Sequence, residues 1–122
     1  MKIERFEDLE CWKKARDLAN MIYELTGQKG FSRDLQLRSQ MRDAGGSVMH
    51  NIAEGFDSGS DAEFVRFLRI SRRSGSEVQS QLYLALDREY ITAIQLRKAY
   101  DKATEVKRLI NGLITYLRKN NR

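Results

Sequence analysis

The sequence predicts an all-α protein, an antiparallel up-down-up-down four-helix bundle, formed as a single domain over residues 1–122. Four long segments repeat apolar side chains with helical spacing, and no segment shows the alternation of a strand. The chain contains no proline, so nothing in it forbids long helices. The breaks between the segments are short, which makes neighbouring helices antiparallel.

The first segment is predicted to be helical over residues 6–26 and ends at the turn residues Gly27–Gly30. The second runs over residues 33–56, with Ser32 as its N-cap. Its middle contains Gly45–Gly46, and each glycine costs about 1 kcal/mol against alanine in a helix. This cost indicates a close approach by a neighbouring helix; a weak or kinked turn is the alternative.

Two capping boxes mark the starts of the remaining helices. Ser60–Glu63 opens a helix predicted over residues 61–89, and Thr92–Gln95 opens one over residues 93–118. The apolar stripe of the last helix follows a heptad-like order, Leu96, Ala99, Ala103, Val106, Ile110, Leu113 and Leu117. Such a stripe is typical of a helix that packs along its whole length in a bundle.

Polar side chains run beside the apolar stripes of the second and third helices. Steps of +7, +4 and +3, or of +3 and +4, place them on one face of each helix. Polar groups beside a core must be hydrogen-bonded, so we predict a structural polar network. Its members are Gln40, Arg42, Ser47, Asn51, Glu54, Ser74, Glu77 and Gln81. A ligand site or a catalytic pair of Glu54 and Glu77 is the alternative.

The positive charge of the chain is concentrated at one end. The net charge is +5, and residues 97–122 hold eight basic and two acidic side chains. We predict a nucleic-acid-binding surface there, at Lys98, Lys102, Arg118, Lys119 and Arg122. A basic ridge on the third helix is the comparison surface, formed by Arg66, Arg69, Arg72 and Arg73. A solvated helix face, with cations favoured near the helix C-terminus, is the other interpretation.

Aromatic side chains are not interleaved with these cations in the sequence. Trp12, Tyr23 and Tyr83 are therefore predicted to pack or to form interfaces, and not to stack on bases. Apolar residues away from the core stripes indicate a homo-oligomer, because a lone bundle would expose them. These residues are Leu18, Leu25, Ile70, Tyr83 and Leu84.

Apart from the alternative for Glu54 and Glu77, no pattern indicates a metal, a cofactor or a catalytic site. His50 and Cys11 are the only residues of their types, and neither has a partner at metal-ligand spacing. No nucleophile elbow and no Glu-x-x-His motif occur. The charged first residues are unlike a signal peptide, and no apolar run is long enough to span a membrane. We therefore expect a cytoplasmic protein that is not an enzyme and has no membrane partner.

Several motifs together are specific to one family. They are Phe6–Leu9 with Trp12, Gln40–Arg42, Ser47, Asn51–Gly55, Ser74–Leu86 and Tyr90–Ile91. On these the chain resembles the bacterial four-helix-bundle proteins of 23S ribosomal RNA intervening sequences. The resemblance implies a bundle that assembles into a ring-like pentamer. A related branch, the accessory variability determinants of diversity-generating retroelements, partners a reverse transcriptase and nucleic acid, while the standalone members have no established enzymatic role.

The chain departs from the family pattern at four positions. Proline is common in the family at the positions of Ser32 and Met49, and glycine at those of Arg73 and Glu89. Without the prolines, the second helix is expected to be straighter.

These observations lead to one expected function and one alternative. We expect a non-enzymatic oligomeric interaction protein, most simply a pentamer, that binds RNA, DNA or a nucleoprotein partner through basic surface. A structural or scaffolding oligomer that binds only protein is the alternative.

Overall fold

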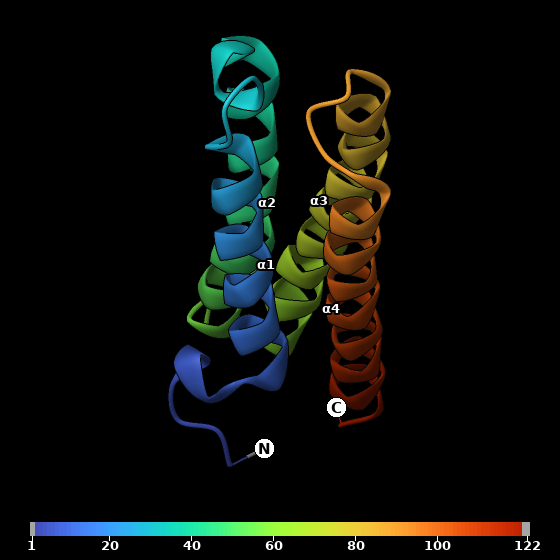
Figure 1. Ribbon diagram of the computed structural model, residues 1–122. Helices are drawn as coiled ribbons and strands as arrows, with labels where there is room; N and C mark the ends of the chain where they lie inside the picture. The colour runs from blue at the N-terminus through green and yellow to red at the C-terminus, as the bar shows by residue number, and fades with distance from the viewer. Residues whose placement is uncertain (1, 121–122) are drawn as a thin grey trace.

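The predicted antiparallel four-helix bundle is confirmed (Figure 1). The computed structural model describes residues 2–120. Its α-helices are α1 (Glu10–Thr26), α2 (Leu35–Phe56), α3 (Asp61–Asp87) and α4 (Ala93–Asn120). Two short 3₁₀ helices, η1 (Phe6–Asp8) and η2 (Phe31–Arg33), precede α1 and α2.

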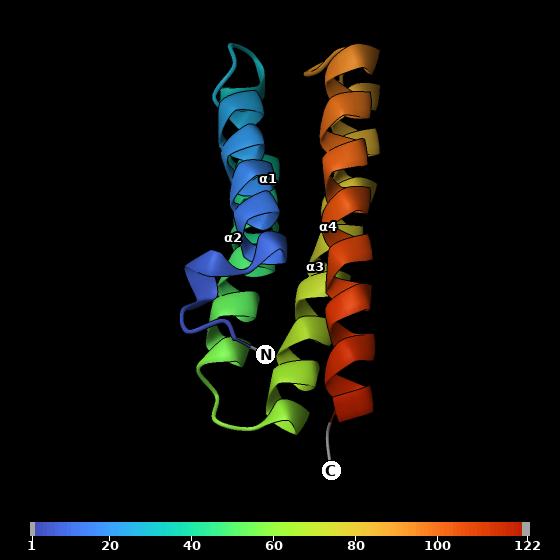
Figure 2. The same cartoon turned by 90° about the horizontal axis from the view of Figure 1, so that it is seen from below.

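The helices pack as a closed ring of four. α1 contacts α2 and α4, and α3 contacts α2 and α4. The start of α1 and the end of α4 lie at the same end of the bundle (Figures 1 and 2). The interior is filled by side chains from all four helices, among them the fully buried Leu18, Ile22, Met41, Val48, Ile52, Leu68, Leu82, Val106 and Ile110.

The first helix begins later than the sequence predicts. Leu9 is extended (φ −73°, ψ 129°) and separates η1 from α1, so residues 6–26 are not one helix. The ring of Phe6 meets that of Trp12 edge to face at 5.2 Å. Because this contact folds η1 back against α1, the chain must break at Leu9, whose own side chain is buried.

The N-cap of α2 also differs from the prediction. Asp34, and not Ser32, caps the helix, since its Oδ1 accepts the N–H of Leu37 at 3.1 Å. Phe31 is completely buried, and residues 31–33 form η2. Burial of Phe31 sets where the chain enters the bundle, and a carboxylate is favourable at the helix N-terminus.

Both predicted capping boxes begin helices. Ser60 Oγ accepts the N–H of Glu63 at 3.1 Å, although the Glu63 carboxylate turns to Arg66. In the second box Thr92 Oγ1 accepts from Gln95 N at 3.1 Å, and Gln95 Oε1 accepts from Thr92 N at 3.0 Å. The reciprocal pair satisfies two backbone donors at the start of α4.

The end of α3 is a Schellman turn. Tyr90 N–H donates to Ala85 O at 3.0 Å, and Glu89 N–H donates to Leu86 O at 2.9 Å. Glu89 therefore adopts φ +61°, the left-handed region that favours glycine. The helix ends at Asp87, two residues before the predicted boundary.

The closest helix approach is not at Gly45–Gly46. A Cβ on Gly45 would lie 3.5 Å from Ile22, which is an ordinary contact. A Cβ on Gly55 would instead lie 2.8 Å from Phe67 Cβ and 2.9 Å from Phe64 Cδ1. The tight contact between α2 and α3 is therefore at Gly55.

Two of the apolar residues assigned to an outer surface belong to the core. Leu18 is fully buried and Leu25 nearly so, which corrects the sequence interpretation. Ile70 is half-buried, whereas Tyr83 and Leu84 remain 47% and 44% exposed on α3. The first helix has a wider buried face than a single stripe, because both α2 and α4 pack against it.

Candidate nucleic-acid interface

Three of the predicted network residues join α2 to α3. Ser47 Oγ lies 2.9 Å from Ser74 Oγ, and Asn51 Nδ2 donates to Ser47 Oγ at 2.9 Å. Ser74 is 9% exposed. This small hydrogen-bonded group satisfies polar atoms at the helix contact, as buried polar groups require.

Other predicted members find separate partners. Arg42 Nε donates to Thr26 Oγ1 of α1 at 2.9 Å, and its guanidinium lies 4.5 Å from the ring centre of Tyr23. Gln81 Nε2 donates to Glu77 Oε2 at 3.3 Å within α3. The structure therefore divides the predicted network into three local groups.

Gln40 and Glu54 do not join any of these groups. Both are exposed, and within residues 2–120 neither side chain has a hydrogen-bonding partner. Glu54 lines an open groove of about 600 Å³ beside Tyr23 and Arg42, whereas Glu77 lines a different groove with Gln40. The prediction that Glu54 belongs to the structural polar network is thus wrong, because this position of α2 turns toward solvent.

Eight side chains form a polar and aromatic seam between α3 and α4. They succeed one another by +4, +3 and +4 along α3, and by the same steps in the opposite direction along α4. This spacing keeps each set on one flank of its helix. We call the seam the α3–α4 ladder; its four cross-helix rungs are Arg72–Asn111, Ser76–Lys107, Gln79–Thr104 and Tyr83–Tyr100.

The two charged rungs hold their cations with neutral acceptors. Arg72 Nη1 donates to Asn111 Oδ1 at 2.6 Å. Lys107 Nζ donates to Ser76 Oγ at 3.0 Å and to Gln79 Oε1 at 2.7 Å. Within residues 2–120 neither cation forms an ion pair, so both charges are positioned without being neutralised.

The other two rungs extend the ladder, which ends at a pair of tyrosine rings. Gln79, only 6% exposed, donates through Nε2 to Thr104 Oγ1 at 2.9 Å and to Tyr100 O at 3.2 Å. The rings of Tyr83 and Tyr100 lie 5.9 Å apart at 74°. Arg97 lies above the Tyr100 ring, 5.3 Å from its centre.

The arginine ridge lies on the outer side of α3, next to the ladder. Its members, Arg66, Arg69, Arg72 and Arg73, line a groove of about 330 Å³ with Ile70. Arg66 is paired with Glu63 at 3.1 Å, and this guanidinium lowers the pKa of the Glu63 carboxyl. Arg69 and Arg73 are exposed and have no hydrogen-bonding or ionic partner in the described part of the chain.

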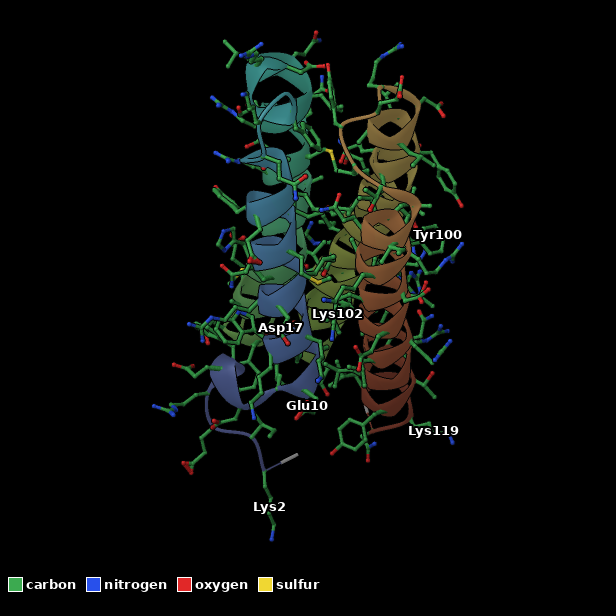
Figure 3. All side chains as sticks on the ribbon, viewed as in Figure 1. Lys2, Glu10, Asp17, Tyr100, Lys102 and Lys119 are labelled. Carbon is green, nitrogen blue, oxygen red and sulfur yellow. The ribbon has the colours of Figure 1, made fainter. Side chains whose placement is uncertain are left out.

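The predicted basic surface on α4 is divided between its flanks. Lys98 lines a groove with Met21 and Gln28, on the side of α1. Lys102 also lies toward α1, and Tyr100 on the opposite flank (Figure 3). The Lys102 ammonium donates to Glu105 at 2.9 Å and lowers the pKa of that carboxyl.

The remaining members of that set lie near the end of α4. Arg118 follows Asn111 by two helical turns and so shares the flank of the ladder. Lys119 is exposed (Figure 3), and Arg122 lies outside the described residues. The described members of this set therefore do not form a single surface, because they lie on different sides of α4.

Sequence reasoning missed Gln79 and Lys107, the two residues at the centre of the ladder. The signal was present, since steps of +4, +3 and +4 link polar and aromatic residues on both helices. Gly75 contributes as well, because a Cβ there would lie 3.2 Å from Lys107 Cγ. The glycine leaves room for the lysine stem to cross onto α3.

Residues 2–120 lack two further features. No group of three or more histidine, cysteine, aspartate or glutamate side chains is arranged to hold a metal ion. No helix in this part of the chain has both the length and the apolar character needed to cross a membrane.

Comparison with known proteins gives a family and several solved structures of similar fold. The family described as 23S rRNA-intervening sequence protein matches residues 7–112. The fold is similar to the crystal structure of a Bacteroides thetaiotaomicron protein of unknown function from the S23 ribosomal protein family. That likeness has a TM-score of 0.79 and 24% identity, and it covers 86% of this chain and 95% of the other. No curated protein matches the chain.

Proposed function

The chain belongs to the 23S rRNA-intervening sequence protein family, and we propose that it is a non-enzymatic protein that binds nucleic-acid phosphates through the arginine ridge. The observation that carries the proposal is the state of Arg69 and Arg73, which have no partner in residues 2–120. They stand beside Arg72, whose partner is a neutral amide. Guanidinium groups bind phosphate bidentately, and uncompensated charges on one surface attract a polyanion.

The same flank offers further cations. Lys107 is held one helical turn along the ladder from Arg72, and Arg118 lies on the ladder flank of α4. On the opposite flank the charge of Lys102 is compensated, because its ammonium donates a hydrogen bond to the Glu105 carboxylate. We therefore assign the phosphate contacts to the α3–α4 side, which includes Arg118 of the predicted α4 set but not Lys98 or Lys102.

Binding of a labelled oligonucleotide at several salt concentrations tests this proposal. We expect affinity to fall steeply with salt, as counterions are released. The double variant Arg69→Gln with Arg73→Gln should bind at least about tenfold more weakly and lower the salt slope by about two. The matched control, Lys98→Gln with Lys102→Gln, removes the same charge from the α1 side and should bind nearly normally. Absence of binding at low salt, or loss in the control alone, would contradict the proposal.

We also propose self-association, as a pentamer in line with the family resemblance. The supporting observation is exposed apolar side chains where α2 begins, α3 ends and α4 begins, namely Leu35 (63%), Leu84 (44%) and Ile94 (81%). Light scattering should give a multiple of 14.2 kDa, and Leu84→Lys should lower it. A monomer mass at micromolar concentration would refute self-association. An assembly that binds no polyanion would favour the scaffold that binds only protein.

The compartment that we propose is the cytoplasm. The one cysteine, Cys11, is a buried thiol and can form no disulfide within its own chain. Such a thiol is compatible with a reducing compartment.

A further inference from the structure

We infer that the α3–α4 ladder binds single-stranded nucleic acid, with the backbone on Arg72 and Lys107 and a base stacked on Tyr83. This inference rests on the proposed function, because it takes the arginine ridge as the site of phosphate contact. It adds the kind of strand and the residue that contacts a base.

The aromatic rung leaves one ring available. Tyr100 is half-buried and is covered by Arg97 at 5.3 Å. Tyr83 is 47% exposed, and it meets Tyr100 edge to face at 5.9 Å and 74°. Tyr83 is therefore braced by its neighbour while much of its own surface faces solvent. The sequence alone assigned this residue to packing or to an interface, because aromatic residues are not interleaved with the cations in the chain.

The order of chemical groups along the ladder fits a strand. Arg72 and Tyr83 are eleven residues apart, which is about 16 Å along a helix. Between them lie the Lys107 ammonium and the Ser76 hydroxyl, 3.0 Å from each other. A groove of cations that continues into an aromatic platform is the arrangement used by proteins that bind single strands.

The charges around the ladder favour a polyanion at the end that holds Arg72 and Lys107, whereas Asp87 lies one helical turn beyond Tyr83. None of the eight ladder residues is acidic. Asp101, one turn from Arg97, is paired with it at 3.5 Å. Glu77 is bonded to Gln81 on the flank of α3 that faces α2. Phosphates at the Arg72 end of the ladder therefore meet positive and neutral groups.

A single strand fits this surface better than a duplex. The bases of a duplex are stacked on one another, so a tyrosine on a helix flank has no base face to contact. The bases of a single strand are free to lie on Tyr83 while the backbone follows the cations.

Fluorescence anisotropy with three probes tests the inference. Each probe is about 15 nucleotides long, which is within the site sizes of single-strand binders. The probes are a natural single strand, an abasic strand and a duplex. We expect the natural strand to bind most tightly. Tyr83→Leu should weaken its binding about 5- to 150-fold, because stacking on one base is lost, and should leave the affinity for the abasic strand unchanged. Tyr83→Phe should retain binding.

Tyr23→Leu is the matched control. Tyr23 is also exposed, at 52%, but its ring lies beside the Arg42 guanidinium and belongs to the α1–α2 side. Its substitution should not change binding to any probe. As a measurement independent of variants, photo-crosslinking of a bromouridine-containing strand should label the peptide that contains Tyr83.

The outcomes separate the two proposals. If natural and abasic strands bind equally and Tyr83→Leu has no effect, the stacking inference is wrong while phosphate binding stands. Tighter binding of the duplex would also overturn it. If none of the three probes binds at low salt, the proposed function itself fails.

Discussion

Tyr90 Oη donates a hydrogen bond to Asp34 Oδ2 at 3.0 Å, which joins the turn after α3 to the first residue before α2. The other carboxylate oxygen of Asp34 caps Leu37. The Tyr90 ring also stacks on the buried Phe31 at 4.9 Å and 27°. The Asp34 carboxylate thus caps the N-terminus of α2 and also anchors the loop between α3 and α4.

Tyr90→Phe should lower the thermal unfolding temperature, since the ring contact stays and the hydrogen bond is lost. The bond to Asp34 raises the pKa of Tyr90 above its ordinary value near 10. The unfolded chain therefore loses this proton first as the pH rises. The contribution is complete below pH 10 and disappears as the pH passes the folded pKa. Melting curves between pH 7 and pH 11 should show the difference between wild type and variant shrinking, whereas a constant difference would contradict the assignment.

Glu89→Gly should stabilise the protein. Glu89 has φ +61°, a conformation that costs an L-residue roughly 1–2 kcal/mol. Glycine adopts it freely but loses more backbone entropy on folding, so we expect a net gain of about 0.5–1 kcal/mol. Urea denaturation measures the gain. Glu89→Ala keeps the strain and should give no comparable increase.

Gly55→Ala and Gly112→Ala should have opposite effects. A Cβ at Gly55 would lie 2.8 Å from Phe67 Cβ, a backbone-proximal atom that cannot rotate away. We expect a loss of about 1–3 kcal/mol from overpacking. Gly112, within α4, has nothing within 4 Å of its Cβ position, so alanine should gain up to about 1 kcal/mol. If the two substitutions changed the free energy of unfolding equally in chemical denaturation, the close packing assigned to Gly55 would be wrong.

Ser74→Ala should cost more stability than Glu54→Ala. The first substitution removes the 2.9 Å contact with Ser47 at a nearly buried position, worth about 0.5–1.5 kcal/mol. Glu54 is exposed and lacks a partner in residues 2–120, so its loss should change stability by less than about 0.5 kcal/mol. If Glu54→Ala lowered the free energy of unfolding more than Ser74→Ala, Glu54 would belong to the structural polar network that the sequence predicted.

Cys11 should be inert in the folded protein. It is 4% exposed, and desolvation raises the pKa of the thiol to about 12. Since the thiolate is the reactive form, iodoacetamide at pH 8 should modify Cys11 only after denaturation. Rapid modification of the native protein, measured by mass spectrometry, would contradict the burial of α1 against the core.

The local sequence determined the helices and their order. Periodicity placed four of them, and the capping box at Thr92–Gln95 marked the start of α4 because its hydrogen bonds are made within four residues. The missed boundaries depended on distant contacts. Asp34 caps α2 in place of Ser32, because Phe31 is buried in the core. The first helix is interrupted at Leu9, because Phe6 packs against Trp12.

Only the tertiary structure decided which polar side chains meet. Helical spacing groups residues on one helix, but it does not set the register of the next helix against it. Arg72 and Asn111 are 39 residues apart, and their contact depends on how α3 and α4 align. The same alignment brings Tyr83 to Tyr100. The sequence by itself therefore determined the bundle and its charge, while packing between helices decided where that charge forms a surface.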